Sequence, residues 1–154
     1  MKIEMAAIGF LRGGRREDVD DKWGKVSASI HLDENRFTAE SLLGLENFSH
    51  IEVLFHFHKA DPAKIETCAR HPRGNRSYPR LGIFAQRAKG RPNRIGSTIC
   101  RLMAIEGTRL VVEGLDAIDG TPILDIKPHI SSFGPKGETN EPAWVSELME
   151  NYWE

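Results

Sequence analysis

The feature that most constrains this chain is a series of strand-like segments joined by connections without room for helices. Within the segments, apolar residues alternate with small or polar ones, the pattern of a strand with one buried face. Parallel strands need long crossovers, usually helical, so these strands should pair antiparallel. We expect a mainly β chain that closes into an antiparallel barrel or curls strongly. The expected strands cover residues 3–11, 26–32, 49–58, 81–88, 95–105, 109–115 and 121–130.

Two local patterns describe connections between these strands. The Asp119-Gly120 pair predicts a tight hairpin between the last two strands, because both central residues of such a turn need positive φ. Leucines 42, 43 and 45 predict a short helix over residues 38–45. Helices are otherwise few in this part of the chain, which agrees with a barrel.

A second short helix is expected at the end of the chain. Trp144, Leu148 and Tyr152 recur every four residues and form one apolar stripe. Pro142 suits the first turn of this helix, with Thr139-Asn140 as caps. The chain therefore divides into a barrel over residues 1–137 and a helix over residues 138–154 that packs on it.

The composition is that of an ordinary globular domain. The 154 residues are 40% hydrophobic and 28% charged, with a formal net charge of −1, which is too apolar for a disordered chain. No apolar run approaches the roughly 20 residues of a membrane helix, and the first residues lack the features of an export signal. Cys68 and Cys100 form neither a disulfide framework nor a zinc spacing. We therefore expect a cytoplasmic protein that does not contact a membrane.

The near-zero net charge conceals a strongly basic stretch. No Asp or Glu occurs between Thr67 and Ile105. A strip of solvated surface usually mixes both signs, so this stretch favours a binding region for an anion, with nucleic acid first among the candidates. Charge alone leaves RNA, a nucleotide and an acidic metabolite open. The nine basic residues are Arg70, Arg73, Arg76, Arg80, Arg87, Lys89, Arg91, Arg94 and Arg101.

Three histidines share one face of an expected strand. His50, His56 and His58 have the same parity, opposite to Phe55 and Phe57. A His-x-His pair binds metal only with a third ligand, and no Cys or clear carboxylate partner is near, so we predict no metal site. Histidines that line a polar cavity are the favoured interpretation, in which one accepts a proton or donates a hydrogen bond.

Glycines and an aspartate mark two further candidate positions. A basic turn, Arg91-Pro92-Asn93-Arg94, leads to Gly96-Ser97, where the glycine allows a ligand to approach closely. Asp116 lies outside the Asp119-Gly120 turn and is the better functional candidate of the two aspartates. Neither a Gly-x-Gly-x-x-Gly motif nor a P-loop is present, which makes a Rossmann fold improbable.

Several blocks together resemble one family. Gly44-Leu45-Glu46-Asn47-Phe48-Ser49-His50-Ile51, Gly82-Ile83-Phe84-Ala85-Gln86-Arg87, Arg91-Pro92-Asn93-Arg94-Ile95-Gly96 and the run Asp116 to Pro128 are similar to signature blocks of the TsaA-like, or TrmO, family. The resemblance covers about residues 8–128. It implies a homodimeric β-barrel methyltransferase that uses S-adenosylmethionine to methylate N6 of threonylcarbamoyladenosine, next to the anticodon in tRNA.

The resemblance also implies a set of site residues. Arg87 would bind the methionine carboxylate of the cofactor in a charge-assisted pair, and Asp116 with the backbone of Leu115 would bind its adenosine part. We predict that His58, with His56 beside it, assists removal of the N6 proton. The cofactor residues that the resemblance implies are His58, Lys59, Arg87, Gly96, Ser97, Gly114, Leu115 and Asp116, and the contacts that we predict with the tRNA anticodon arm are Arg73, Arg76, Arg80, Arg91 and Arg94.

The chain departs from the family pattern in four places. Lys59 stands where the family usually has Gln, the loop 70–80 is longer, residues 20–23 replace an Arg-Gln-Pro-Gly-like stretch, and the helix at 144–153 stands in place of a larger C-terminal region. Two other functions stay open beside tRNA methylation. One is methylation of a small anionic acceptor, and the other is a non-catalytic barrel that binds RNA or a nucleotide.

Overall fold

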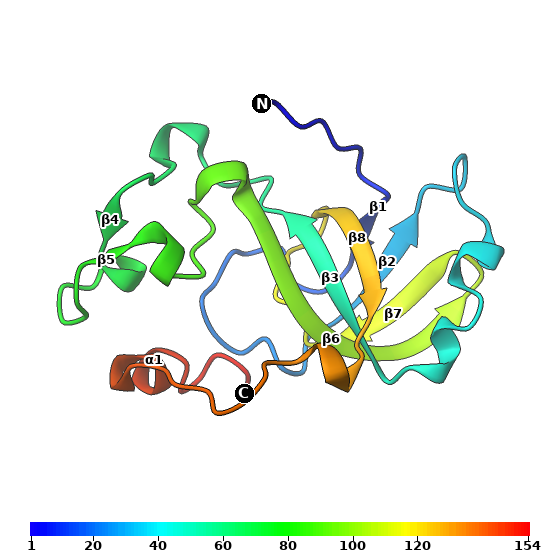
Figure 1. Cartoon of the computed structure of the whole chain (residues 1–154). Coiled ribbons are helices and arrows are strands. Elements are labelled where there is room, and N and C mark those ends of the chain that lie inside the picture. Colours follow the sequence, from blue (N-terminus) through cyan, green and yellow to red (C-terminus); the bar gives the residue numbers. More distant parts are fainter.

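The computed structural model describes all of residues 1–154, and its centre is a closed antiparallel barrel. The order of strands around the barrel is β1-β2-β7-β6-β3-β8, and every neighbouring pair is antiparallel (Figure 1). The prediction of a mainly β chain with a closed barrel is confirmed. The strands are β1 (Gly9–Arg12), β2 (Ser27–Leu32), β3 (His50–His56), β6 (Ile95–Glu106), β7 (Arg109–Glu113) and β8 (Pro122–Pro128).

The alternation seen in the sequence defines the barrel core. On β3, Ile51, Val53 and Phe55 are at most 1% exposed, while the residues between them are only half-buried. The same period of two places the inward residues of the other strands in one apolar cluster of 14 buried residues. Burial of these side chains supplies the main driving force for folding the barrel.

Gly96 lets the largest core side chain pack against the neighbouring strand. Gly96 is the cross-strand partner of Phe55, and a Cβ at Gly96 would lie 2.4 Å from the Phe55 ring and 2.9 Å from that of Phe57. The two rings meet edge to face, with centroids 5.3 Å apart. Gly96 thus serves core packing, because any larger residue would collide with an aromatic ring.

The connection between β3 and β6 leaves the barrel as an arm, which we define as residues 57–94 (Figure 1). A two-stranded sheet of β4 (Ala69–Arg70) and β5 (Leu81–Gly82) forms its centre. The expected strand over 81–88 is wrong beyond Gly82, because the chain turns into a 3₁₀ helix. The 3₁₀ helices of the arm are η3 (Pro62–Lys64), η4 (Pro72–Gly74), η5 (Ile83–Ala85) and η6 (Pro92–Arg94).

Gln86 explains why the arm turns there. Its side chain is 9% exposed, and its Nε2 donates hydrogen bonds of 2.9 Å to the carbonyls of Arg70 and Leu81. The carboxamide therefore bridges both strands of the arm at the point where the second strand ends. These two buried hydrogen bonds stabilise the turned backbone more than the weakly alternating residues of this segment would stabilise an extended strand.

The expected hairpin at Asp119-Gly120 is wrong, although a turn is present. Thr121 donates a backbone hydrogen bond of 3.1 Å to Ile118, and Gly120 has φ +83°. The turn does not pair β7 with β8, because both edges of β7 are taken by β2 and β6 and those of β8 by β1 and β3. Asp119 instead accepts a hydrogen bond of 2.9 Å from the backbone of Gly13.

The other expected boundaries shift for local reasons. The first strand begins at Gly9, six residues later than the expected 3–11. The expected helix over 38–45 consists of two 3₁₀ helices, η1 (Ala39–Leu42) and η2 (Leu45–Asn47), because Gly44 between them has φ +90°. A further 3₁₀ helix, η7 (Ser131–Phe133), follows β8. No helix has the length and apolar character needed to cross a membrane.

The expected C-terminal helix is present but short. Helix α1 (Ala143–Leu148) is preceded by Pro142 at the N-cap position, so the expected caps Thr139-Asn140 lie outside it. We call residues 143–153 the C-terminal segment. Its apolar stripe is half-buried. Trp144 packs on Tyr78 of the arm with ring centroids 6.2 Å apart, and the carbonyl of Tyr152 accepts a hydrogen bond of 2.8 Å from Trp23.

Replacing Gly96 with alanine should destabilise the barrel by about 1–3 kcal/mol, because the new methyl group overlaps the Phe55 ring. Urea unfolding followed by circular dichroism measures this change. Gly82→Ala is the matched control, since the nearest atom to its Cβ would lie 3.9 Å away. Equal stability of the two variants would contradict the packing role of Gly96.

Candidate functional site

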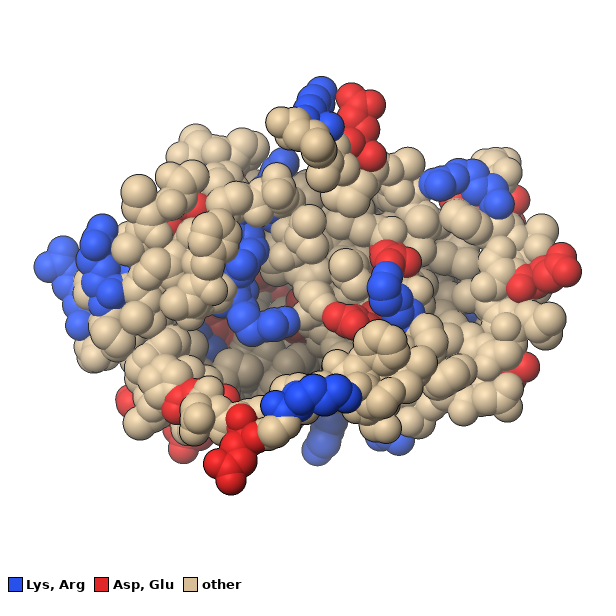
Figure 2. All heavy atoms as spheres, in the orientation of Figure 1, with Lys and Arg blue, Asp and Glu red and all other residues tan.

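One rim of the barrel carries the candidate site. The antiparallel order brings the ends of β1, β3 and β7 and the beginnings of β2, β6 and β8 to the same rim. The arm and the C-terminal segment also lie on this side, and Figure 2 shows a hollow between them and the barrel with Lys and Arg atoms on its edge. A cavity of about 40 Å³ is lined here by Asp18, Trp23, Phe55, Phe57, His58, Lys59, Ala60, Lys89, Asp116, Ala117, Ile118 and Thr121.

Asp116 is a carboxylate of this rim that accepts two side-chain hydrogen bonds. It follows β7 and lines the cavity. Its Oδ1 accepts a short hydrogen bond from the Thr98 hydroxyl, and its Oδ2 accepts one from the Tyr152 hydroxyl. Both oxygens are therefore held by hydroxyl donors, one from β6 and one from the C-terminal segment.

Arg87 and Asp116 converge on consecutive residues of β6. The Arg87 guanidinium donates to the carbonyl of Ser97, while Asp116 accepts from Thr98. Arg87 also acts electrostatically on the Tyr152 phenol, whose pKa burial and Asp116 raise and Arg87 lowers. The two side chains predicted for the cofactor carboxylate and adenosine thus bind adjacent residues of β6, although only Asp116 lines the cavity.

His58 is placed at the cavity by the end of β3. Its backbone N–H donates to the carbonyl of His56 at 2.8 Å, which turns the chain out of the strand and toward the arm. Burial and then the positive charge of Lys59 lower the pKa of His58, with a smaller opposing effect of its hydrogen bond to His56. A histidine with a lowered pKa is neutral at pH 7 and able to accept a proton.

His56 does not reach the cavity. It remains on the half-buried outer side of β3, where burial, Arg94 and His58 together lower its pKa. The His58 charge acts on His56, so the two side chains lie near each other, but only His58 lines the cavity. The role of His56 beside His58 stays a prediction.

The predicted cofactor residues Gly96, Ser97, Gly114 and Leu115 lie in β6 or at the end of β7, and none of them lines the cavity. Gly96 is buried under Phe55, so it offers no open approach to a ligand. Ser97 lies within β6 and not in a turn, and its hydroxyl donates to Glu52 at 2.8 Å. Gly114 has φ +82° at the end of β7, and Leu115 is a core residue that is 1% exposed.

The five predicted RNA contacts fall into two groups. Arg73 binds the Asp21 carboxylate with both of its terminal nitrogens, at 2.8 and 3.3 Å. Arg91 and Arg94 donate to the carbonyls of Gln86 and Ala60, at 2.7 and 3.2 Å, and are half-buried. Arg76 and Arg80 are exposed, and neither is in any of the six ion pairs of the chain.

The structure adds site residues that the sequence did not reveal. Trp23 and Asp18 line the cavity from the loop before β2, and Lys89 lines it from the arm and binds the Asp18 carboxylate. This loop is the stretch where the chain departs from the family pattern. Tyr152 reaches Asp116 from 36 residues away. Its place in the apolar stripe indicated packing but gave no sign of a polar contact.

Cys100 is a buried thiol of the barrel interior whose pKa is raised by burial and by the charge of Asp116. The thiol is on the inner side of β6 and 2% exposed. Burial and the nearby Asp116 carboxylate raise its pKa to about 12. The thiol is therefore protonated at neutral pH, which makes it a poor nucleophile.

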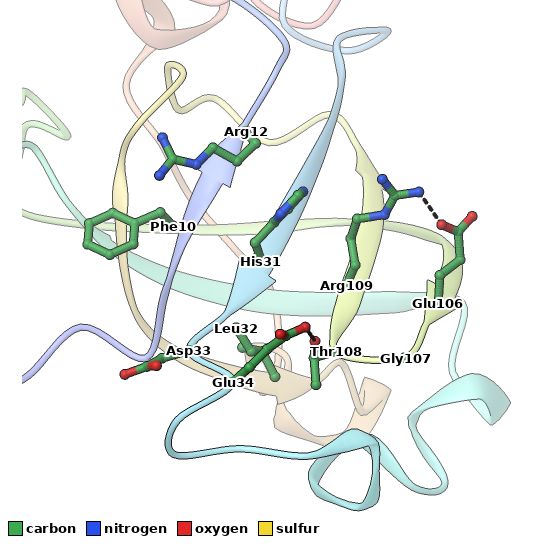
Figure 3. A pocket seen from close by; sticks show the side chains of 10 residues that line it. All are labelled: Phe10, Arg12, His31, Leu32, Asp33, Glu34, Glu106, Gly107, Thr108 and Arg109. Atoms are coloured by element: carbon green, nitrogen blue, oxygen red, sulfur yellow. Dashed lines mark hydrogen bonds and ion pairs between the residues drawn. The ribbon is translucent and has the colours of Figure 1, made fainter.

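A separate groove lies on another face of the barrel. Its volume is about 740 Å³, and it is formed over the outer face of β1, β2 and β7 (Figure 3). None of the predicted site residues lines it. Arg109 forms an ion pair with Glu106, and the Thr108 hydroxyl donates a hydrogen bond to Glu34. The lining residues are Phe10, Arg12, His31, Leu32, Asp33, Glu34, Glu106, Gly107, Thr108 and Arg109.

Comparison with known proteins relates this chain to enzymes that modify tRNA. The family model described as the tRNA-methyltransferase O N-terminal domain matches residues 21–134. The tRNA (adenine(37)-N6)-methyltransferase of Homo sapiens is 40% identical to the chain over 111 residues, which are 72% of this chain and 25% of the human protein. The chain thus spans a quarter of that relative.

Two further relatives match over most of the chain. A probable S-adenosyl-L-methionine-binding protein of Methanothermobacter thermautotrophicus is 33% identical over 141 residues, 89% of this chain and 97% of that protein. The crystal structure of TrmO from Pseudomonas aeruginosa superposes with a TM-score of 0.73 and 32% identity, and covers 91% of this chain and 62% of that one. With a matched family model and a relative aligned along nearly its whole length, the chain belongs to the tRNA-methyltransferase O N-terminal domain family.

Proposed function

We propose that the chain transfers a methyl group from S-adenosylmethionine to N6 of threonylcarbamoyladenosine, next to the anticodon of a tRNA. The observation that carries this proposal is the convergence of Arg87 and Asp116 on Ser97 and Thr98, beside a basic arm. Membership in the family and the activity of the human relative, a tRNA (adenine(37)-N6)-methyltransferase, support it.

The residues at the rim fit the chemistry of this cofactor. Arg87 is a cation with free donors for a carboxylate, and Asp116 is an acceptor for ribose hydroxyls. The cavity, about 40 Å³, is far smaller than S-adenosylmethionine, so the cofactor would extend from it over the rim, with Lys59 and Trp23 beside it.

When bound, the cofactor supplies an electrophilic methyl group, and the chain must align the acceptor with it. His58 lines the same cavity as Asp116 and is neutral at pH 7 because its pKa is lowered. It is our candidate for the group that accepts the proton leaving N6. Burial and the charge of Lys59 lower the pKa of His58 and keep its imidazole neutral, and His56, on the outer side of β3, lies near it.

The arm is the proposed contact with the anticodon arm of the tRNA. Arg76 and Arg80 are exposed and outside every ion pair, so their guanidinium groups are available to phosphates. Arg73, Arg91 and Arg94 hold the arm through internal hydrogen bonds and keep further donors for RNA. Their proposed role is therefore both structural and electrostatic.

We also propose the organisation in which this reaction takes place. The unit is a barrel over residues 1–137 with residues 138–154 packed on it, and two such units form a homodimer in the cytoplasm. The family resemblance supports the dimer, as do Ile99 and Met103, which are 50% and 49% exposed on β6.

Incubation with S-adenosylmethionine labelled in its methyl group and with total tRNA tests the function. Label should appear in tRNA, and nucleoside mass spectrometry should place it on threonylcarbamoyladenosine. Arg87→Ala should abolish labelling and cofactor binding in calorimetry, whereas Arg101→Ala, an exposed arginine elsewhere on the barrel, should not.

The other outcomes favour the two alternative functions. Cofactor binding without labelled tRNA would favour a small anionic acceptor. Absence of cofactor binding would favour a non-catalytic barrel that binds RNA or a nucleotide. Unchanged affinity of Arg87→Ala would remove Arg87 from the proposed site.

His58→Ala should lower kcat by about 10²–10⁴-fold, the usual contribution of a general base, with a smaller effect on cofactor affinity. In the wild type, kcat should fall on acidification only below pH 6.5, because the pKa of His58 is lowered and protonation removes the acceptor. A pH series of initial rates measures this, with His31→Ala on the outer face of β2 as control. Retention of full turnover by His58→Ala would end its assignment as the base.

Neutralising Arg76 and Arg80 together with glutamine should weaken tRNA binding and flatten its salt dependence. Loss of two phosphate contacts reduces the slope of log K against log salt by roughly 1.5. Fluorescence anisotropy with tRNA at several salt concentrations measures the slope. Arg12→Gln with Arg109→Gln is the matched control, as both line the groove of Figure 3 and remove the same charge. Equal slopes for the two double variants would exclude the arm as the RNA contact.

A further inference from the structure

We propose that Tyr152 is a positioning residue of the cofactor site. Its hydroxyl donates a hydrogen bond to the Asp116 carboxylate and holds it in the orientation needed to bind the cofactor. The inference deepens the proposed function and depends on it. It also assigns a task to the C-terminal segment, residues 143–153, which supplies Tyr152.

Two hydroxyl groups fix the orientation of the Asp116 carboxylate. The carboxylate follows the end of β7 in a connection without regular structure, so backbone pairing alone does not fix its side chain. Thr98 and Tyr152 each donate to one of its two oxygens. Asp116 lines the cavity, whereas Thr98 and Tyr152 do not. The two hydroxyls therefore hold the carboxylate from behind, and leave its open side to a ligand.

The Asp116 carboxylate can still accept hydrogen bonds from a ligand. Each carboxylate oxygen has two lone pairs, so an oxygen that accepts one hydroxyl can accept another. Burial and the Asp116 charge both raise the pKa of Tyr152, while Arg87 and Arg73 oppose this effect. The phenol consequently stays protonated and remains a donor throughout the pH range in which the protein works.

The backbone around Tyr152 is itself held by the loop before β2. Its carbonyl accepts a hydrogen bond of 2.8 Å from the N–H of Trp23, and the carbonyl of Asn151 accepts one of 2.9 Å from Lys22. The backbones are in close contact, since a Cβ at Gly24 would lie 2.0 Å from the carbonyl oxygen of Trp153. Trp23 lines the cavity, so Tyr152 supports two of its walls, one through its hydroxyl and one through its backbone.

The first test uses Tyr152→Phe, which removes the hydroxyl and keeps the ring. Calorimetry with S-adenosylhomocysteine, which lacks the reactive methyl group, should show about tenfold weaker binding. In the labelling assay the KM for S-adenosylmethionine should rise more than kcat falls. Asp116→Asn should also weaken binding, and adding Tyr152→Phe to it should cause little further loss, because the two groups act as a unit.

Trp153→Phe is the matched control for this test. Trp153 packs edge to face on Tyr152 at 4.8 Å, is 46% exposed, and makes no contact with Asp116 through a polar group. The control loosens the packing of the same segment without touching the hydrogen bond. Binding of S-adenosylhomocysteine should be unchanged in this variant.

A second test detects the hydrogen bond between Tyr152 and Asp116 without any cofactor, through the ionisation of the Tyr152 phenol. The chain has two tyrosines, so Tyr78→Phe leaves Tyr152 as the sole phenol. Ultraviolet absorbance should show ionisation of this phenol at a higher pH than in the double variant Tyr78→Phe, Asp116→Asn. The comparison separates the local contact from the proposed function.

Each outcome decides the inference. Unchanged affinity of Tyr152→Phe, or an affinity loss equal to that of Trp153→Phe, would overturn the positioning role. Tighter binding would also overturn it, since Tyr152 would then compete with the ligand for Asp116. If the wild type does not bind S-adenosylhomocysteine while the absorbance shift is present, the proposed function and the role of Tyr152 in it both fail, and only the hydrogen bond stands.

Discussion

Closure of the barrel between β1 and β8 is the constraint on which the rest of the structure depends. Only two residue pairs, Gly9 with Ile123 and Phe10 with Pro122, join these strands. This short seam removes the exposed edges of the sheet, and the antiparallel order around the closed barrel fixes which ends of the strands share a rim. His58 after β3, Thr98 near the start of β6 and Asp116 after β7 are neighbours because β6 pairs antiparallel with both β3 and β7, although the three residues are far apart in the sequence.

The parts of this structure that the sequence predicts are those specified by local periodicity. The expected strands over residues 49–58 and 95–105 correspond to β3 and β6, because a closed sheet buries the inward side chains of β3 and of the first half of β6. The arm is different, since its course depends on Gln86 binding two carbonyls that belong to other segments. No local pattern contains such a contact.

The candidate site shows the same division. Arg87 and Asp116 were predicted from a resemblance of sequence blocks, and the structure brings them to consecutive residues of β6. Gly96 was expected to admit a ligand, but a flexible residue type does not reveal that an aromatic ring fills the space beside it. The contact of Tyr152 with Asp116 could not be predicted, because it depends on how the end of the chain crosses the loop before β2.

The position of Trp23 has a practical consequence. Of the three tryptophans, Trp23 is 2% exposed and lines the cavity, while Trp153 is 46% exposed. Indole emission shifts with the polarity of its surroundings, so a molecule that enters the cavity alters the spectrum of one shielded fluorophore. The chain thus carries an intrinsic optical reporter at its own candidate site, and occupancy of that site can be followed in solution without a label.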